Sequence, residues 1–177
     1  LKHVENIKKY GLNPIVAINK FTSDTEKEIE ILQNELKGKV EFSLLENWAK
    51  GGSGAKDLAE KVVQICEEPK NFKPIYELNS SLEKKIEKVA KEIYGARNVV
   101  YSDEAKAEIE QIRYSAQNMP VCIAKTQYSF SDDPKNLECQ EPFEITIRDV
   151  ELKAGAGFIV VLTGQIITMP GLPKVPS

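Results

Sequence analysis

The sequence is poor in the residues on which several common kinds of active site depend. Its 177 residues include one histidine, His3, which nearly excludes a Ser/His/Asp triad or a histidine-rich metal site. The three cysteines, Cys66, Cys122 and Cys139, form no CxxC pair and are odd in number. They therefore argue against a disulfide framework and favour a reducing compartment. No glycine-rich phosphate loop ending in Lys-Ser or Lys-Thr is present.

Long apolar runs and an excess of one charge are also absent. The longest apolar run, 158–162, is far too short to cross a membrane, and the N-terminal residues lack the order of a signal peptide. The chain carries 24 basic and 27 acidic residues, a net charge of −3, whereas dedicated nucleic-acid binders usually have a basic excess. With 41% hydrophobic and 29% charged residues, we expect a globular protein of the cytoplasm without a nucleic-acid or membrane partner.

Both ends of the sequence lack the signals of a natural terminus. Leu1 opens inside an amphipathic helical pattern without a start methionine or a capping residue, and the chain stops at Ser177 in a proline-rich stretch. We therefore expect a fragment of a longer protein.

The first part of the chain alternates apolar strands with amphipathic helices, as is typical of α/β folds. Strands are predicted at 14–19 and 40–44, and the continuous apolar run of the first predicts a parallel strand buried on both faces. Between them lies a predicted helix that begins with a capping box from Ser23 to Glu26 and ends at Gly38. Because a short helix joins the two strands, we expect a right-handed parallel crossover.

The composition changes at 67–74, where two prolines occur close together. We therefore divide the chain into an α/β domain at 1–68 and a smaller α+β domain at 69–177. In the second domain, Ser80 or Ser81 caps one predicted helix and Ser102 caps another. The predicted strands of this domain are 98–101, 121–124, 143–148, 158–162 and 166–168.

The first candidate site follows the first predicted strand, at the end where ligands bind in open α/β sheets. Asn19, Lys20 and Asp24 form an Asn-Lys pair followed by an aspartate, as in the base-reading element of GTPases. That element has one residue between Lys and Asp, whereas this chain has three, so a diverged GTPase fragment is the weaker interpretation. Asp24 and Thr25 are also ordinary helix-capping residues. Capping leaves unexplained why an aromatic residue, Phe21, occupies the loop.

The second candidate site follows the second predicted strand and contains Trp48, the only tryptophan. Since parallel strands end at one edge of a sheet, we expect Phe21 and Trp48 at the same edge, where two aromatic side chains can hold a flat heteroaromatic ring. The alternative is that Trp48 packs into the core beneath the next helix. The glycines at 51–54 precede a predicted helix and allow a backbone anion site.

Two further segments carry many hydrogen-bonding or turn residues. Residues 124–134 follow a predicted strand, and Asp132-Asp133-Pro134 in this segment is typical of a turn. Residues 169–176 contain closely spaced prolines, which suit either a binding loop or a plain connection.

Four segments of the chain resemble formate–tetrahydrofolate ligases, in the order in which that family has them. They are GLNPIVAINKFTSDTE at 11–26, WAKGG at 48–52, AKTQYSFSDDP at 124–134 and MPGLP at 169–173. The resemblance covers the chain from end to end, and its segments are specific.

The resemblance implies an enzyme that phosphorylates formate with ATP and transfers the formyl group from formyl phosphate to N10 of tetrahydrofolate, leaving ADP and phosphate. It also implies a parallel sheet like that of P-loop NTPases with flanking helices, and an oligomeric full-length protein. ATP and Mg²⁺ are expected to bind through an N-terminal part that this chain lacks, and a monovalent cation is a further expected cofactor. We therefore expect no catalytic or metal-binding residue here and no activity from this chain alone.

The family's pterin-binding residues fall on Phe21, Trp48 and Leu44 of this sequence. The resemblance thus implies that Phe21 and Trp48 stack on the pterin ring and that Leu44 lines its pocket. The other residues expected to line the cleft are Asn19, Lys20, Asp24, Lys50, Gly51, Gly52, Lys125, Thr126, Gln127 and Tyr128. A non-catalytic folate-binding or assembly module remains the alternative interpretation.

Overall fold

The chain folds into two units. The structure is a computed structural model that describes residues 1–137, 142–164 and 166. The first unit spans Leu1–Pro74 and the second Ile75–Ser177. Among the described residues no helix is long and apolar enough to span a bilayer.

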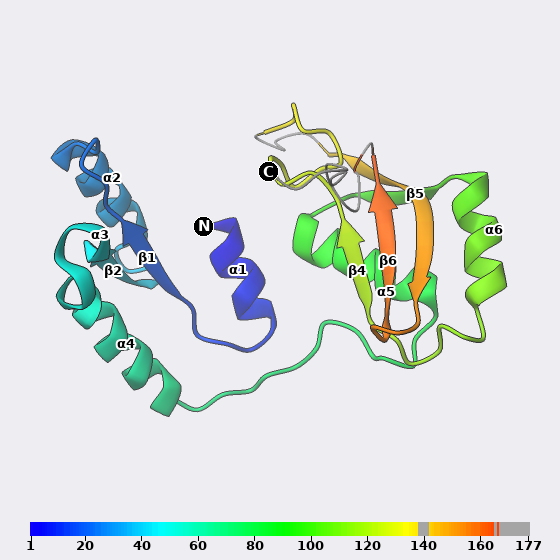
Figure 1. Ribbon diagram of the computed structural model, residues 1–177, viewed down its shortest axis with the longest axis horizontal. Helices are drawn as coiled ribbons and strands as arrows, with labels where there is room; N and C mark the ends of the chain where they lie inside the picture. Colours follow the sequence, from blue (N-terminus) through cyan, green and yellow to red (C-terminus); the bar gives the residue numbers. More distant parts are fainter. Residues whose placement is uncertain (138–141, 165, 167–177) are drawn as a thin grey trace, which may run out of the picture. The chain divides into compact units, whose positions relative to one another are not determined.

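The first unit is built from helices around a small parallel sheet (Figure 1). In chain order its elements are α1 (Lys2–Lys9), β1 (Ile15–Asn19), α2 (Glu26–Leu36), β2 (Glu41–Leu45), α3 (Asn47–Lys50), the 3₁₀ turn η1 (Gly51–Ala55) and α4 (Lys56–Glu67). β1 and β2 run parallel, as predicted, with Ile18 opposite Leu44. A parallel pair joined by a helix is an α/β arrangement, and many folds besides the P-loop type contain it.

The core of the first unit lies on the α2 face of this sheet. Ile18 of β1 packs with Ile29 and Leu36 of α2, and all three side chains are buried. On the other face Ser43 of β2 is buried, whereas Ala17 of β1 is exposed. The prediction that β1 is buried on both faces is therefore wrong for this chain, because α4 covers β2 more fully than β1.

The capping box of α2 differs from the predicted one. Thr25, not Ser23, is the N-cap residue: its hydroxyl accepts a hydrogen bond from the amide of Glu28, and the Glu28 carboxylate accepts one from the amide of Thr25 at 2.8 Å. Glu26 instead pairs with Lys20, with Nζ and Oε1 2.5 Å apart. Two Ser/Thr-x-x-Glu patterns overlap here, one from Ser23 to Glu26 and one from Thr25 to Glu28. The carboxylate of the first pattern, Glu26, pairs with Lys20, and the second pattern forms the capping box.

The segment after α4 returns along the end of α1. The amide of Lys73 donates to the carbonyl of Tyr10 at 3.0 Å, and the rings of Phe72 and Tyr10 stack with centroids 6.3 Å apart. These contacts hold the proline-containing segment on the first unit up to the boundary at Pro74.

The second unit is a mixed sheet covered by helices (Figure 1). Its elements are α5 (Leu82–Lys88), the π-helical turn η2 (Val89–Tyr94), β3 (Asn98–Tyr101), α6 (Asp103–Ile112), β4 (Val121–Ala124), β5 (Glu144–Lys153) and β6 (Phe158–Thr163). The strand order is β3-β5-β6-β4. β3 and β5 pair parallel, β5 and β6 antiparallel, and β4 and β6 parallel.

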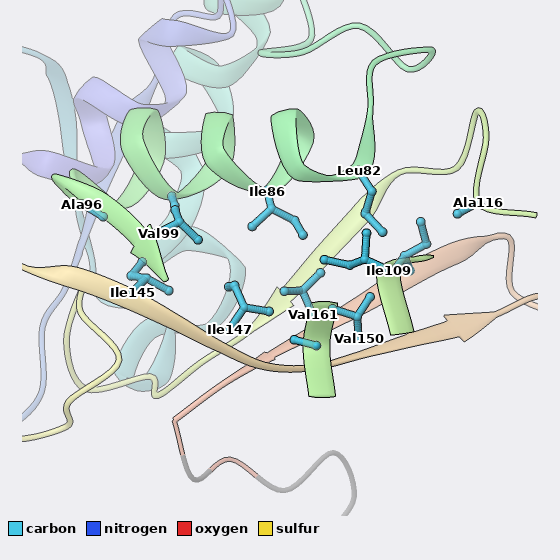
Figure 2. Packing of buried hydrophobic residues seen from close by; sticks show 13 residues of the cluster. Leu82, Ile86, Ala96, Val99, Ile109, Ala116, Ile145, Ile147, Val150 and Val161 are labelled. Carbon is cyan, nitrogen blue, oxygen red and sulfur yellow. The ribbon is translucent and has the colours of Figure 1, made fainter. Parts of the chain in front are cut away.

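The main core of the chain lies between this sheet and its helices. Figure 2 shows Ile86 of α5 pointing toward Ile147 and Val161 of the sheet, and all three side chains are fully buried. Lys85, the neighbour of Ile86, is buried as well, and its ammonium donates to the carbonyl of Met119 at 2.8 Å. No sequence pattern indicates this buried lysine, because its burial depends on the segment 34 residues further along the chain.

Local predictions for the second unit agree well with the structure. Ser81 and Ser102 cap α5 and α6, and the predicted strands at 98–101 and 121–124 are β3 and β4. β5 extends beyond the predicted strand 143–148 because it pairs with the whole of β6. Three parts of the sequence analysis fall outside the described residues: the last two residues of the predicted strand 166–168, Cys139, and the segment 169–176.

Candidate functional site

The candidate site is the edge of the sheet at which β1 and β2 end. The last register pair is Asn19 opposite Leu45, and the amide of Lys20 then donates to the carbonyl of Leu45 at 2.9 Å. The segments that carry Phe21 and Trp48 therefore leave the sheet from neighbouring strand ends. The predicted common edge is confirmed.

Phe21 lies in a tight turn between β1 and α2. Its amide donates to Oδ2 of Asp24 at 2.8 Å, and the amide of Asp24 donates back to the carbonyl of Phe21 at 3.2 Å. The ring is 51% exposed, so the turn holds an aromatic side chain in solvent. Because the Asp24 carboxylate already accepts a hydrogen bond from the amide of Phe21, it is poorly placed to bind a guanine base. This counts against the GTPase interpretation.

Trp48 lies on the short helix α3, directly after β2. Its side chain is 73% exposed, so the alternative of core packing within this chain is wrong. The helix is closed by the Glu46 carbonyl, which accepts from the amides of Ala49 and Lys50 at 3.1 and 2.9 Å. Large exposed aromatic side chains are uncommon and often mark binding surfaces.

The glycine-rich turn η1 anchors the segment that carries Trp48. The amide of Glu46 donates to the carbonyl of Gly54 at 3.1 Å. A Cβ atom at Gly54 would lie 2.5 Å from the carbonyl carbon of Glu46, so only glycine allows this approach. Gly51 has a φ of 60°, and a Cβ atom at Gly51 or Gly52 would meet nothing within 4 Å. One face of this turn is therefore open.

Leu44 has a different environment from the two aromatic residues. Its side chain is half-buried and packs against the cluster of Ile18, Ile29 and Leu36. It thus contributes to the core of the first unit, and its predicted place in a pterin pocket stays a prediction.

Both lysines at this edge are paired with carboxylates. Lys20 lies 2.5 Å from Glu26, and this hydrogen bond is the main reason that the pKa of Lys20 is raised. Lys50 lies 2.5 Å from Glu46, and its hydrogen bond is the main reason that the pKa of Glu46 is lowered. An anionic ligand at this edge would therefore have to compete with these carboxylates for the ammonium groups. The amide side chain of Asn19 makes no hydrogen bond with any described residue.

The predicted site residues of the second unit follow β4. The Lys125 ammonium donates to the carbonyl of Thr126 at 2.7 Å and to the carbonyl of Ser129, and it lies 5.1 Å from the centroid of the Tyr94 ring. Thr126, Gln127 and Tyr128 instead line a cavity of about 370 Å³. The structure therefore brings Thr126, Gln127 and Tyr128 together at one cavity, whereas the ammonium of Lys125 binds carbonyls of its own loop.

Sequence reasoning misses part of this cavity wall. Asp132 and Pro134 are predicted only as turn residues, and no pattern singles out Thr163 at the end of β6, yet all three line the cavity. The order of the strands is the missing information, because β6 pairs with β4 only in the folded sheet.

The described residues contain no cluster of the side chains that most often bind metal ions. In the described ranges, no group of three or more His, Cys, Asp or Glu side chains could hold one. The described residues therefore offer no cluster of carboxylates for Mg²⁺, and we derive no chemical step through a metal ion. Cys66 and Cys122 are free and exposed.

Comparison with known proteins gives a consistent result over the whole chain. A family model described as formate–tetrahydrofolate ligase matches residues 1–177. The formate–tetrahydrofolate ligases of Staphylococcus aureus strains JH9, Newman and COL are each 52% identical to the chain over 178 aligned residues. Each alignment covers 99% of this chain and 32% of the relative, so the chain spans about a third of the length of these proteins.

Proposed function

Since the chain belongs to the formate–tetrahydrofolate ligase family, we propose that its first unit binds the pterin ring of tetrahydrofolate between Phe21 and Trp48, with Leu44 lining the pocket. The whole enzyme would use ATP to convert formate to formyl phosphate and would transfer the formyl group to N10 of tetrahydrofolate. The observation that carries the proposal is the exposure of two large aromatic side chains after neighbouring parallel strands.

The energetics of ring stacking support this use of the two side chains. Each aromatic contact contributes about 0.5–1.5 kcal/mol beyond the burial of apolar area. The backbone that carries each side chain is held by hydrogen bonds, Phe21 by its turn with Asp24 and Trp48 by the bonds of α3. A site whose backbone is already ordered loses less conformational entropy when it binds its ligand.

The surrounding polar residues would orient the ring. Asn19 offers an amide without a partner among the described residues at the end of β1, and the turn containing Gly51 and Gly52 leaves space beside its backbone. Lys20, Asp24 and Lys50 are proposed to line the cleft while keeping their internal partners.

We propose that the 177-residue chain binds folate without catalysing the reaction. Phosphoryl transfer depends on cationic groups and Mg²⁺ around the transferred phosphate, and the sequence has no glycine-rich phosphate loop. The chain should therefore form no 10-formyltetrahydrofolate from ATP, formate and tetrahydrofolate. Product formation by the purified chain would contradict this part of the proposal.

Binding is tested by titrating the ¹⁵N-labelled chain with folic acid. The single tryptophan gives one indole N–H resonance, which we expect to shift as Trp48 contacts the ring. Replacing Phe21 by Ala should weaken binding about tenfold, the equivalent of one strong aromatic contact. Phe72→Ala is the matched control, because Phe72 is 60% exposed in the same unit and stacks on Tyr10, away from the ends of β1 and β2. An unmoved indole resonance at millimolar folic acid, or equal affinities of the two variants, would refute the aromatic site.

A further inference from the structure

The turn that carries Phe21 is closed by a single residue, Asp24. Residues 21–24 form a β-turn in which the amide of Asp24 donates to the carbonyl of Phe21 at 3.2 Å. Oδ2 of Asp24 reaches back across the turn and accepts from the amide of Phe21 at 2.8 Å. Both backbone polar groups of Phe21 therefore bind the same residue.

These two hydrogen bonds fix the direction in which the Phe21 side chain leaves the backbone. The bond from the amide orients the peptide plane before Phe21, and the bond to the carbonyl orients the plane after it, so φ and ψ are both restrained. The ring itself is 51% exposed and lies outside the buried cluster of the first unit. Because packing does little to hold this side chain, the backbone of the turn sets its direction.

No other hydrogen bond or salt bridge occupies the Asp24 carboxylate among the described residues. Thr25, and not Asp24, is the N-cap of α2. The neighbouring ammonium of Lys20 pairs with Glu26 instead, at 2.5 Å. The bond to the amide of Phe21 is therefore the one structural contact that this carboxylate makes in the described part of the chain.

The turn is also tied to the segment that carries Trp48. The amide of Lys20, next to Phe21, donates to the carbonyl of Leu45 at 2.9 Å, and Leu45 lies three residues before Trp48. The segment of Trp48 has its own hydrogen bonds to the carbonyl of Glu46, which do not involve the turn. Loosening the turn at Phe21 would therefore disturb one wall of the proposed pterin site and leave the other in place.

We propose that Asp24 is a positioning residue of the pterin site, whose carboxylate holds the turn of Phe21 so that the ring can stack on the ligand. Its contribution to binding passes through Phe21. This inference rests on the proposed function and adds to it the residue that orders one of the two aromatic walls. A turn that is closed before the ligand arrives leaves less backbone entropy to be lost on binding.

The test measures the folic acid affinity of the 177-residue chain through the Trp48 indole resonance. Asp24→Ala should weaken binding about fivefold, the lower end of the cost of ordering the backbone of one residue. Asp24→Asn keeps an acceptor oxygen at the same reach and should bind within about twofold of the parent. Asp24→Glu keeps the charge but is one methylene longer, so its affinity should resemble that of Asp24→Ala.

A double-mutant cycle separates positioning from a direct contact with the ligand. If Asp24 acts through Phe21, Asp24→Ala should have no further effect on affinity once Phe21 is replaced by Ala. Thr25→Ala is the matched control, because it removes the cap of α2 beside the same turn and leaves the bonds of Phe21 in place. It should lower the urea concentration at which the first unit unfolds without changing the folic acid affinity.

Three results would overturn the inference. They are equal affinities of Asp24→Asn and Asp24→Glu, an equal loss from Asp24→Ala with and without Phe21, and a loss in Thr25→Ala as large as in Asp24→Ala. If Asp24→Ala does not fold, the comparison of Asp24→Asn with Asp24→Glu decides.

Failure of this inference is distinguishable from failure of the pterin site. If Phe21→Ala weakens folic acid binding and Asp24→Ala does not, only the positioning role is wrong. If Phe21→Ala binds folic acid as tightly as the parent does, the aromatic site is wrong and the positioning role falls with it.

Discussion

The sharpest structural prediction concerns Gly54, whose backbone supports the segment that carries Trp48. A Cβ atom at this position would lie 2.5 Å from both the carbonyl carbon and the oxygen of Glu46, and 2.8 Å from the amide nitrogen of Asn47. All three are backbone atoms, so no side-chain rotation can relieve the contact. In Gly54→Ala the two segments must move apart, and the hydrogen bond from the Glu46 amide to the Gly54 carbonyl must lengthen.

The expected cost combines two effects. Forcing an extra methyl group into a packed position typically costs about 1–3 kcal/mol, and losing one backbone hydrogen bond costs about 1 kcal/mol more. We therefore expect Gly54→Ala to lower the free energy of unfolding of the first unit by about 2–4 kcal/mol. Urea denaturation followed by Trp48 fluorescence measures it, because the only tryptophan lies in this unit.

The matched control is Gly52→Ala in the same turn. A Cβ atom at Gly52 would meet nothing within 4 Å, and exposed substitutions of this kind change stability by about 0.5 kcal/mol or less. Both variants replace a glycine of this turn by alanine, but only Gly54→Ala places the new methyl group against the backbone of Glu46. If Gly54→Ala unfolds at the same urea concentration as Gly52→Ala, the close approach does not constrain this turn.

Two further predictions concern the second unit. The Tyr101 hydroxyl is buried without a hydrogen-bond partner among the described residues, and burial raises its pKa, so Tyr101→Phe should leave the free energy of unfolding unchanged or raise it by about 1 kcal/mol in a urea titration. Burial is the main reason that the pKa of Glu108 is raised above its ordinary 4.5, and the neighbouring Asp149 raises it further. The folded state therefore keeps this proton to a higher pH than the unfolded state does. As a result, the protein loses stability as the pH rises from the unfolded pKa through the raised folded pKa. Glu108→Gln keeps an acceptor for the amide of Val150, and thermal unfolding should show it to be more stable than the parent at neutral pH and equal to it below about pH 4. A parent that gains stability relative to Glu108→Gln as the pH rises from about 4 to 7 would contradict this sign.

Local features of the fold can be predicted from the sequence because the interactions that stabilise them join residues only a few positions apart. Ser81 and Ser102 cap their helices through amides three residues ahead, and the predicted strands at 98–101 and 121–124 have the observed bounds. The error at the start of α2 is also local. Ser23 and Thr25 offer overlapping capping patterns, and the choice between them follows the pairing of Glu26 with Lys20.

The exposure of the Phe21 and Trp48 side chains is harder to predict from the sequence. The common strand edge of Phe21 and Trp48 follows from the parallel α/β pattern, but a lone tryptophan is as compatible with a core as with a surface. The structure excludes core packing within this chain because Trp48, on the short helix α3, is 73% exposed.

The sequence by itself thus determined the order of the main strands and helices, the caps of α5 and α6, and the strand ends at which Phe21 and Trp48 lie. Only the tertiary structure decided the order β3-β5-β6-β4, the burial of Lys85 and the cavity that joins Tyr128 to Thr163. The physical reason is the range of the interactions. A cap or a hydrophobic period acts within one or two turns of chain, whereas a sheet register and a cavity wall depend on backbone pairings between residues that lie far apart in the sequence.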